Sequence, residues 1–162
     1  MNKKLYYFLT LLLTIFLAFI SCSNEPCNKF IDSSLIKCVK KIVKAKKNGS
    51  LNDSNIIKVV FSKGNNNKIY VTIRDDISYS EKANNFVLDG YLLMDDNLIG
   101  FYNLEIYKKY LGKCLTKLDV PVKYNYENFD SVSVNWWAFE IMEDESLVLI
   151  RKGGNKNLQV RF

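Results

Sequence analysis

The chain has 162 residues, 48% of them hydrophobic and 14% aromatic, which is a globular composition and excludes a disordered chain. It contains no histidine, so catalytic designs and zinc sites that depend on an imidazole are excluded. The formal net charge of +6 reflects either a general bias of composition or a polyanionic partner.

The first 21 residues have the order of a secretory signal peptide. Lys3 and Lys4 form a short positive start, and residues 5–20 form an uncharged, mostly apolar run. About 20 apolar residues are needed to span a bilayer, so this run is slightly short for a permanent membrane helix. We therefore expect residues 1–21 to be a removable signal peptide, with an uncleaved anchor as the alternative.

The leader closes on Phe19-Ile20-Ser21-Cys22. This ending resembles the lipobox of bacterial lipoproteins, although Phe19 stands where leucine is usual. The resemblance implies that the thiol of Cys22 receives a diacylglycerol, that the chain is cut before it, and that the new amino group is acylated. Several acyl chains on one residue anchor a protein stably, whereas one chain binds weakly. In the alternative, an ordinary signal peptide is cleaved and Cys22 forms a disulfide.

The resemblance also implies a location in the cell envelope. We expect a lipidated tether at residues 22–27 and a single domain at residues 28–162, facing the periplasm or the cell surface. Ser23 follows the cysteine, and by resemblance to enterobacterial lipoproteins this favours the outer membrane.

Three cysteines remain if Cys22 carries lipid, and disulfides persist outside the inner membrane. Eleven helical residues between Cys27 and Cys38 would rise about 16 Å, past the Cα separation of about 7 Å that a bridge allows. We therefore favour Cys38–Cys114, which would contribute about 4 kcal/mol by closing a long loop. Cys27–Cys114 and no bridge stay open. The absence of a C-x-x-C spacing predicts no metal site, and we expect no cofactor.

Residues 28–48 have the pattern of an amphipathic helix. Asp32, Ser33 or Ser34 would cap its start, and Gly49 fits its end. Its apolar stripe consists of Ile31, Leu35, Cys38, Val39 and Ile42. The lysines between them have two interpretations. They form a basic face that contacts anionic lipid or an acidic partner, or they form a solvated helix face. They are Lys37, Lys40, Lys41, Lys44, Lys46 and Lys47.

The rest of the chain reads as short strands joined mostly by tight turns. The residues at 106–112 fit a short helix or an extension of the preceding strand. Because strands joined by tight turns pair antiparallel, we expect an α+β domain, with one N-terminal amphipathic helix packed on an antiparallel β-meander of about six to eight strands. The expected strands lie at 56–61, 68–74, 86–94, 98–104, 132–142, 147–151 and 158–162.

Trp136 and Trp137 are the most suggestive pair for binding. Neighbouring residues of a strand point to opposite faces, so one indole enters the core and the other faces outward. The outward indole would either bind a partner protein, a peptide or a sugar ring of an envelope polymer, or merely cover the far face of the sheet. The sequence does not decide which of the two faces outward.

Acidic groups at 75–76, 95–96 and 143–145 fall in predicted turns. Paired carboxylates can serve hydrolysis, but solvation of the turns explains them as well. We therefore predict a non-enzymatic binding or interaction module, which could neutralise or scaffold a partner protein. The alternatives are an envelope hydrolase or carbohydrate-active enzyme that uses acidic residues, and a structural envelope-assembly lipoprotein. The predicted compartment disfavours nucleic acid, and the sequence sets no oligomeric state.

Overall fold

The computed structural model describes residues 7, 9–12, 26–47, 56–76, 82–83, 86–117, 135–154 and 160. The chain divides into two compact units, Met1–Asp32 and Ser33–Phe162. In the first unit, residues 7, 9–12 and 26–31 are helical. None of the helices in these described ranges is long and apolar enough to cross a bilayer. Most of the predicted signal peptide, Cys22 and Gly49 lie outside the described residues.

The second unit begins with helix α2 at Ser34–Lys47. The Oγ atom of Ser33 accepts a hydrogen bond from the backbone N–H of Ile36 at 3.3 Å, which satisfies one of the unpaired donors of the first turn. Asp32 is in a turn and Ser33 in a bend, so residues 28–48 do not form one continuous helix. Ile31 precedes this break and is 43% exposed, so it does not belong to the buried stripe.

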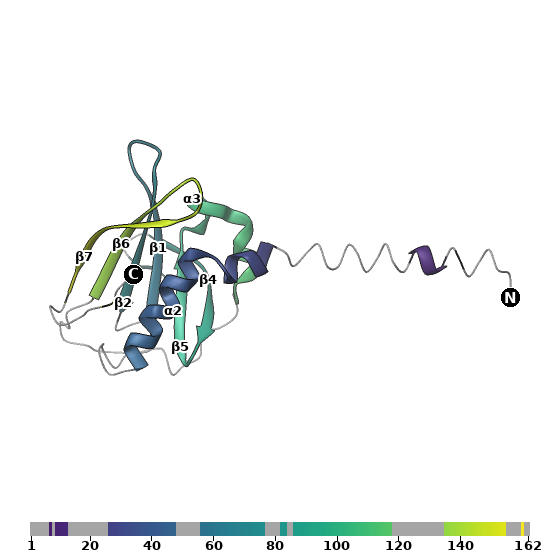
Figure 1. The fold of residues 1–162 in the computed structure, drawn as a ribbon, viewed down its shortest axis with the longest axis horizontal. Coiled ribbons are helices and arrows are strands. Elements are labelled where there is room, and N and C mark those ends of the chain that lie inside the picture. Colours follow the sequence, from purple (N-terminus) through teal and green to yellow (C-terminus); the bar gives the residue numbers. More distant parts are fainter. Residues whose placement is uncertain are drawn as a thin grey trace. The chain divides into compact units, whose positions relative to one another are not determined.

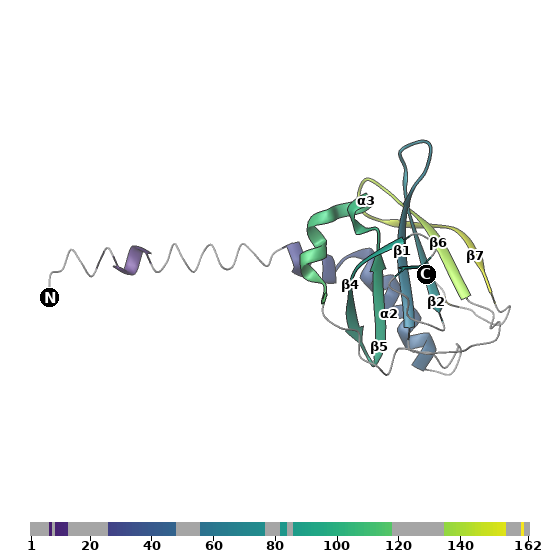
Figure 2. The same ribbon diagram turned by 180° about the vertical axis from the view of Figure 1, so that it is seen from behind.

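Helix α2 lies over one face of the sheet, as both views show (Figures 1 and 2). Its lysines at 37, 40, 41 and 44 are exposed, whereas Lys46 is buried. The buried apolar stripe recurs at three- and four-residue steps. It consists of Leu35, Ile36, Cys38, Val39, Ile42 and Val43.

The sheet has six main strands and a two-residue strand at one edge, in the order β3-β4-β5-β1-β2-β6-β7. The structure is therefore an α+β fold, as predicted. The strands are β1 (Ile56–Lys63), β2 (Ile69–Asp76), β3 (Lys82–Ala83), β4 (Phe86–Met94), β5 (Asn97–Tyr102), β6 (Asn135–Ile141) and β7 (Leu147–Gly153). Of the strand predicted at 158–162, only Val160 is described, and it belongs to no strand.

The sheet is mixed, so the predicted antiparallel meander is wrong at one place. β1 pairs with β5 in parallel, whereas the neighbouring pairs are antiparallel. Residues 56–61 of β1 are all buried, Lys58 included, and they lack the regular alternation of apolar and polar residues that a half-exposed strand would show. Such a strand needs neighbours at both edges. The β4–β5 hairpin supplies the second neighbour and lies beside β1 rather than beyond β2.

Tight turns connect the hairpins, as the sequence predicts for residues 95–97. Asp95 and Asp96 have φ values of 46° and 60°, and two left-handed residues match the twist of a two-residue hairpin. Residues 104–114 are helical and do not extend the strand: α3 covers Leu104–Lys108 and the 3-10 helix η1 covers Lys109–Cys114. Tyr107 of α3 stacks on Phe61 of β1, with ring centroids 5.3 Å apart.

The hydrophobic core lies between α2 and the sheet. Strand register places Val59, Ile73 and Trp137 in one row across β1, β2 and β6, on the face that carries Asp75. Asp75 contacts Lys46 of α2, so this is the face that the helix covers. The large side chains buried on it include Phe61, Phe101, Trp137 and Phe139.

Candidate functional site

The two tryptophans point to opposite faces of β6, and the structure decides which one is buried. Trp137 is opposite Ile73 on the face that α2 covers, and it is 1% exposed. It is a core residue and cannot serve as the binding platform considered from the sequence. Trp136 lies on the other face and is half-buried.

Trp136 packs across the sheet toward β7. It is opposite Gly153, and a Cβ atom added at that glycine would lie 2.5 Å from the indole Nε1. The indole therefore occupies the space that a side chain at 153 would need. On its other side it is opposite Arg74, which is in turn opposite Lys58. Trp136 thus continues a row of amphipathic side chains on the face away from α2, and its outer surface is only partly accessible to a partner.

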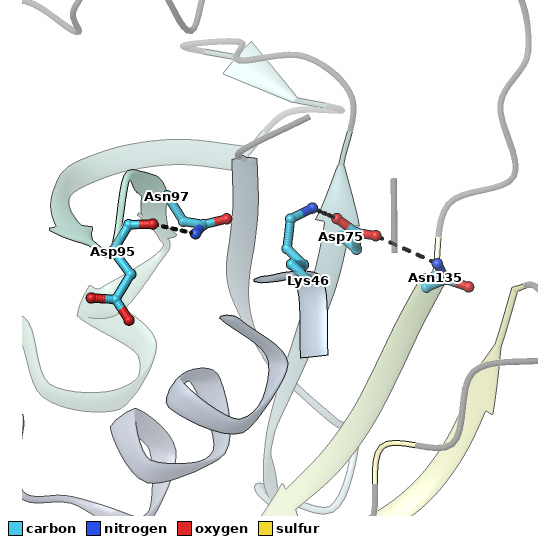
Figure 3. Close-up of polar contacts among 5 residues, drawn as sticks. All are labelled: Lys46, Asp75, Asp95, Asn97 and Asn135. Atoms are coloured by element: carbon cyan, nitrogen blue, oxygen red, sulfur yellow. Dashed lines mark hydrogen bonds and ion pairs between the residues drawn. The ribbon is translucent and has the colours of Figure 1, made fainter. Parts of the chain in front are cut away.

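A buried polar cluster joins the end of α2 to the sheet (Figure 3). Lys46 forms an ion pair with Asp75, and the two side chains are 4% and 0% exposed. Asp75 also accepts a hydrogen bond from Nδ2 of Asn135 at 3.4 Å. The prediction of Lys46 on a basic outer face is therefore wrong, because its position in the buried stripe directs the amine to a carboxylate.

Asp75 was expected in a solvated turn, but β2 extends through Asp76 and carries it into the core. The Lys46–Asp75 pair is closed to solvent and connects α2 to β2. Asn97 lies at the start of β5 and donates from Nδ2 to the carbonyl of Asp95 at 2.9 Å (Figure 3). Its Oδ1 is buried and has no hydrogen-bond partner among the described residues.

The cysteines differ from the favoured pairing. Cys38 is a free, buried thiol, so the predicted Cys38–Cys114 bridge is wrong. Cys27 and Cys114 are each disulfide-bonded. Burial raises the pKa of the Cys38 thiol to about 12, against a smaller opposite effect of Lys41. The sequence held this clue, because Cys38 falls within the apolar stripe and behaves as a small hydrophobic side chain.

The remaining acidic groups lie in exposed turns, as expected. Asp95 and Asp96 form the β4–β5 turn. In the β6–β7 turn, Glu145 pairs with Lys108 of α3, and hydrogen bonds with Ser146 lower the pKa of Asp144. Across the described ranges, no group of three or more acidic or cysteine side chains is placed to hold a metal ion.

Strand β7 is the surface that the sequence analysis missed. Its side chains Val148, Leu149 and Ile150 are between 40% and 53% exposed, and Met142 in the preceding turn is 42% exposed. The sequence predicted a strand at residues 147–151, without indicating how exposed its side chains are. Its apolar run does not alternate with polar residues, which is the pattern of a buried strand, so local pattern did not indicate this exposure.

The comparisons with known proteins identify no relative. No protein-family profile matches the chain, and neither the search of curated proteins nor the search of solved structures finds a significant match.

Proposed function

We propose that this chain is a lipid-anchored cell-envelope protein that acts as a non-enzymatic binding module. The leader supports the anchor, because a positive start, an apolar run and the ending Ser21-Cys22 resemble a lipoprotein signal. Acylation at Cys22 would hold the module at a membrane surface, since two or more acyl chains bind stably. The fold then presents its binding surface to the periplasm or the cell exterior.

The observation that carries the binding role is the exposed apolar strand at the edge of the sheet. β7 is the last strand in the sheet order, and its outer side chains remain in solvent. Edge strands offer unpaired backbone N–H and C=O groups to another chain, and natural proteins usually blunt them with charges in the strand itself. In β7 the two charged residues, Arg151 and Lys152, lie at the C-terminal end, and Leu147–Ile150 before them forms an uninterrupted apolar run. This arrangement suits a partner that adds a strand.

The anchor is tested by labelling cells with radioactive palmitate and by mapping the mature N-terminus. We expect label on the protein, a first residue at Cys22, and membrane fractionation that is lost in Cys22→Ala. Cys38→Ala is the matched control, because this thiol is buried and should not affect fractionation. An unlabelled protein, or a mature N-terminus elsewhere, would contradict the anchor.

The binding role is tested by placing a photo-crosslinking residue at Ile150 and, as a control, at Leu93. Both side chains are more than half exposed, but Leu93 lies on β4, on the far side of β1 in the sheet order. We expect crosslinked products in envelopes from position 150 and few from position 93. Equal yields from the two positions would contradict a binding surface on β7.

A further inference from the structure

The exposed apolar side chains of the second unit lie mainly in β7 and in the residue that ends β6. Six large hydrophobic residues of its described part are exposed, and four of them are Met142, Val148, Leu149 and Ile150. Strand β7 ends the sheet order and lies beside β6 in both views (Figures 1 and 2). Within the described ranges it pairs only with β6, so its outer edge has backbone groups that another strand can use.

Apolar side chains are exposed on both faces of β7. Leu149 is opposite Phe139, so it continues a row on the face that α2 covers, and it is 40% exposed. Val148 is opposite Glu140, on the other face, and it is 49% exposed. Because neighbouring residues of a strand alternate between the two faces, a strand added to β7 covers both side chains only if it carries consecutive apolar residues.

The C-terminal end of β7 carries positive charge that the neighbouring acidic residues do not neutralise. Arg151 and Lys152 are exposed, and neither side chain forms an ion pair in the part of the chain that the structure describes. Glu140 of β6 and Glu145 of the β6–β7 turn each pair with a lysine of another part of the fold. The two cations therefore favour a partner with acidic residues at this end of the strand.

The other end of β7 limits how such a partner can lie. Glu143 and Asp144 of the preceding turn are exposed and would repel acidic residues. The β-bulge at Ile150 interrupts the ladder with β6, and bulges restrict pairing at edges. We therefore expect backbone pairing along Leu147–Leu149 only, with the acidic side chains of the partner beyond the bulge.

We propose that β7 binds an extended segment of another protein in which acidic residues precede a short apolar run, and that this segment pairs antiparallel with β7. The proposal deepens the binding role proposed above and rests on it for the choice of surface. Antiparallel pairing is the more stable kind per residue, and it places the start of the segment beside Arg151 and Lys152. Backbone hydrogen bonds supply affinity, and the side chains of the segment supply specificity.

The first test measures the binding of fluorescent peptides to the full-length chain in mild detergent. The probe peptide has two glutamates followed by an alternating run of valine and isoleucine. One control peptide begins with two lysines instead, and the other has the residues of the probe in reverse order. We expect the probe to bind severalfold more tightly than either control and to bind more weakly as salt is added. Equal binding of the probe and either control, including no binding by any peptide, would overturn the proposal.

Charge reversal on the chain is the second test. Arg151→Glu combined with Lys152→Glu should weaken binding of the probe about tenfold, because repulsion replaces attraction. Lys109→Glu combined with Lys113→Glu is the matched control, since both lysines are exposed but lie in η1. It should change the affinity little. An equal loss in the two double variants would show that overall charge attracts the probe, and the proposal would be wrong.

The third test identifies the natural partner from the crosslinks at Ile150. Mass spectrometry of the crosslinked peptide should find a segment in which acidic residues precede apolar ones. A crosslink to lipid, to a second copy of this chain or to a segment without acidic residues would refute this choice of partner, although β7 would remain a contact surface. Equal crosslinking from positions 150 and 93 would instead contradict the binding role itself.

Discussion

Replacing Lys46 by methionine is expected to destabilise the fold more than the change of one lysine usually does. Methionine retains an apolar stem of similar length but removes the ammonium group from its ion pair with Asp75. The carboxylate, which is 0% exposed, is then left in the core without its cation. Removing one partner of a buried pair costs about 3–5 kcal/mol, a large part of the roughly 5–15 kcal/mol that stabilises a domain. The hydrogen bond from Asn135 to Asp75, at 3.4 Å, is too long to compensate for the lost charge.

Two further variants separate charge from packing. Lys46→Met combined with Asp75→Leu removes both charges, and it should recover most of the lost stability, because an apolar pair often replaces a buried ion pair without cost. Lys68→Met is the matched control on the surface. It breaks the pair of Lys68 with Glu140, whose side chains are 50% and 19% exposed, and it should leave the free energy of unfolding nearly unchanged.

Urea unfolding of the protein in mild detergent measures these differences, with tryptophan fluorescence as the probe. Trp137 is suited to this, because it is 1% exposed when folded and becomes solvated on unfolding. The reasoning fails if Lys46→Met is no less stable than Lys68→Met. It also fails if the double variant is as unstable as the single one, since packing would then account for the loss.

Three other outcomes can be checked directly. Gly153→Val should displace the indole of Trp136, since a Cβ atom at 153 would lie 2.5 Å from Nε1. We expect the free energy of unfolding to fall by about 1–3 kcal/mol and the tryptophan fluorescence to change. A variant that matches the wild type in both would contradict the packing of Trp136 against position 153. The Cys38 thiol should resist maleimide at neutral pH until the protein is denatured, because burial raises its pKa to about 12, and labelling of the folded protein would count against this. Non-reducing peptide mapping should find Cys27 and Cys114 in disulfides and Cys38 as a free thiol; a peptide in which Cys38 is bridged would refute this assignment.

Sequence patterns predicted the secondary structure well where it depends on residues adjacent in the chain. The hairpin at residues 95–97 follows from residues that tolerate left-handed conformations, and the structure places Asp95 and Asp96 in that region. The alternation of β6 predicted that its two tryptophans face apart, which the structure confirms. The α+β class followed from the order of these elements.

Sequence reasoning failed where a residue's partner is distant along the chain. Lys46 and Asp75 are both charged and were expected in solvent. They are 29 residues apart in the sequence, and the packing of α2 on the sheet brings them together in the core. Cys38 was assigned to a disulfide although its place in the apolar stripe also suited a buried thiol, and only the structure showed that it is free. Neither the position of β5 beside β1 nor that of β7 at the edge follows from the periodicity of either strand.

The sequence alone therefore determined the α+β class and the opposite orientation of Trp136 and Trp137, because each depends on residues adjacent in the chain. Only the tertiary structure decided which indole is buried, which polar groups pair inside the core, and which strand is left at the edge. These outcomes depend on the order of strands in the sheet and on the face that α2 covers. That order includes the parallel pairing of β1 with β5, and the periodicity of a single strand does not specify which strand lies beside it.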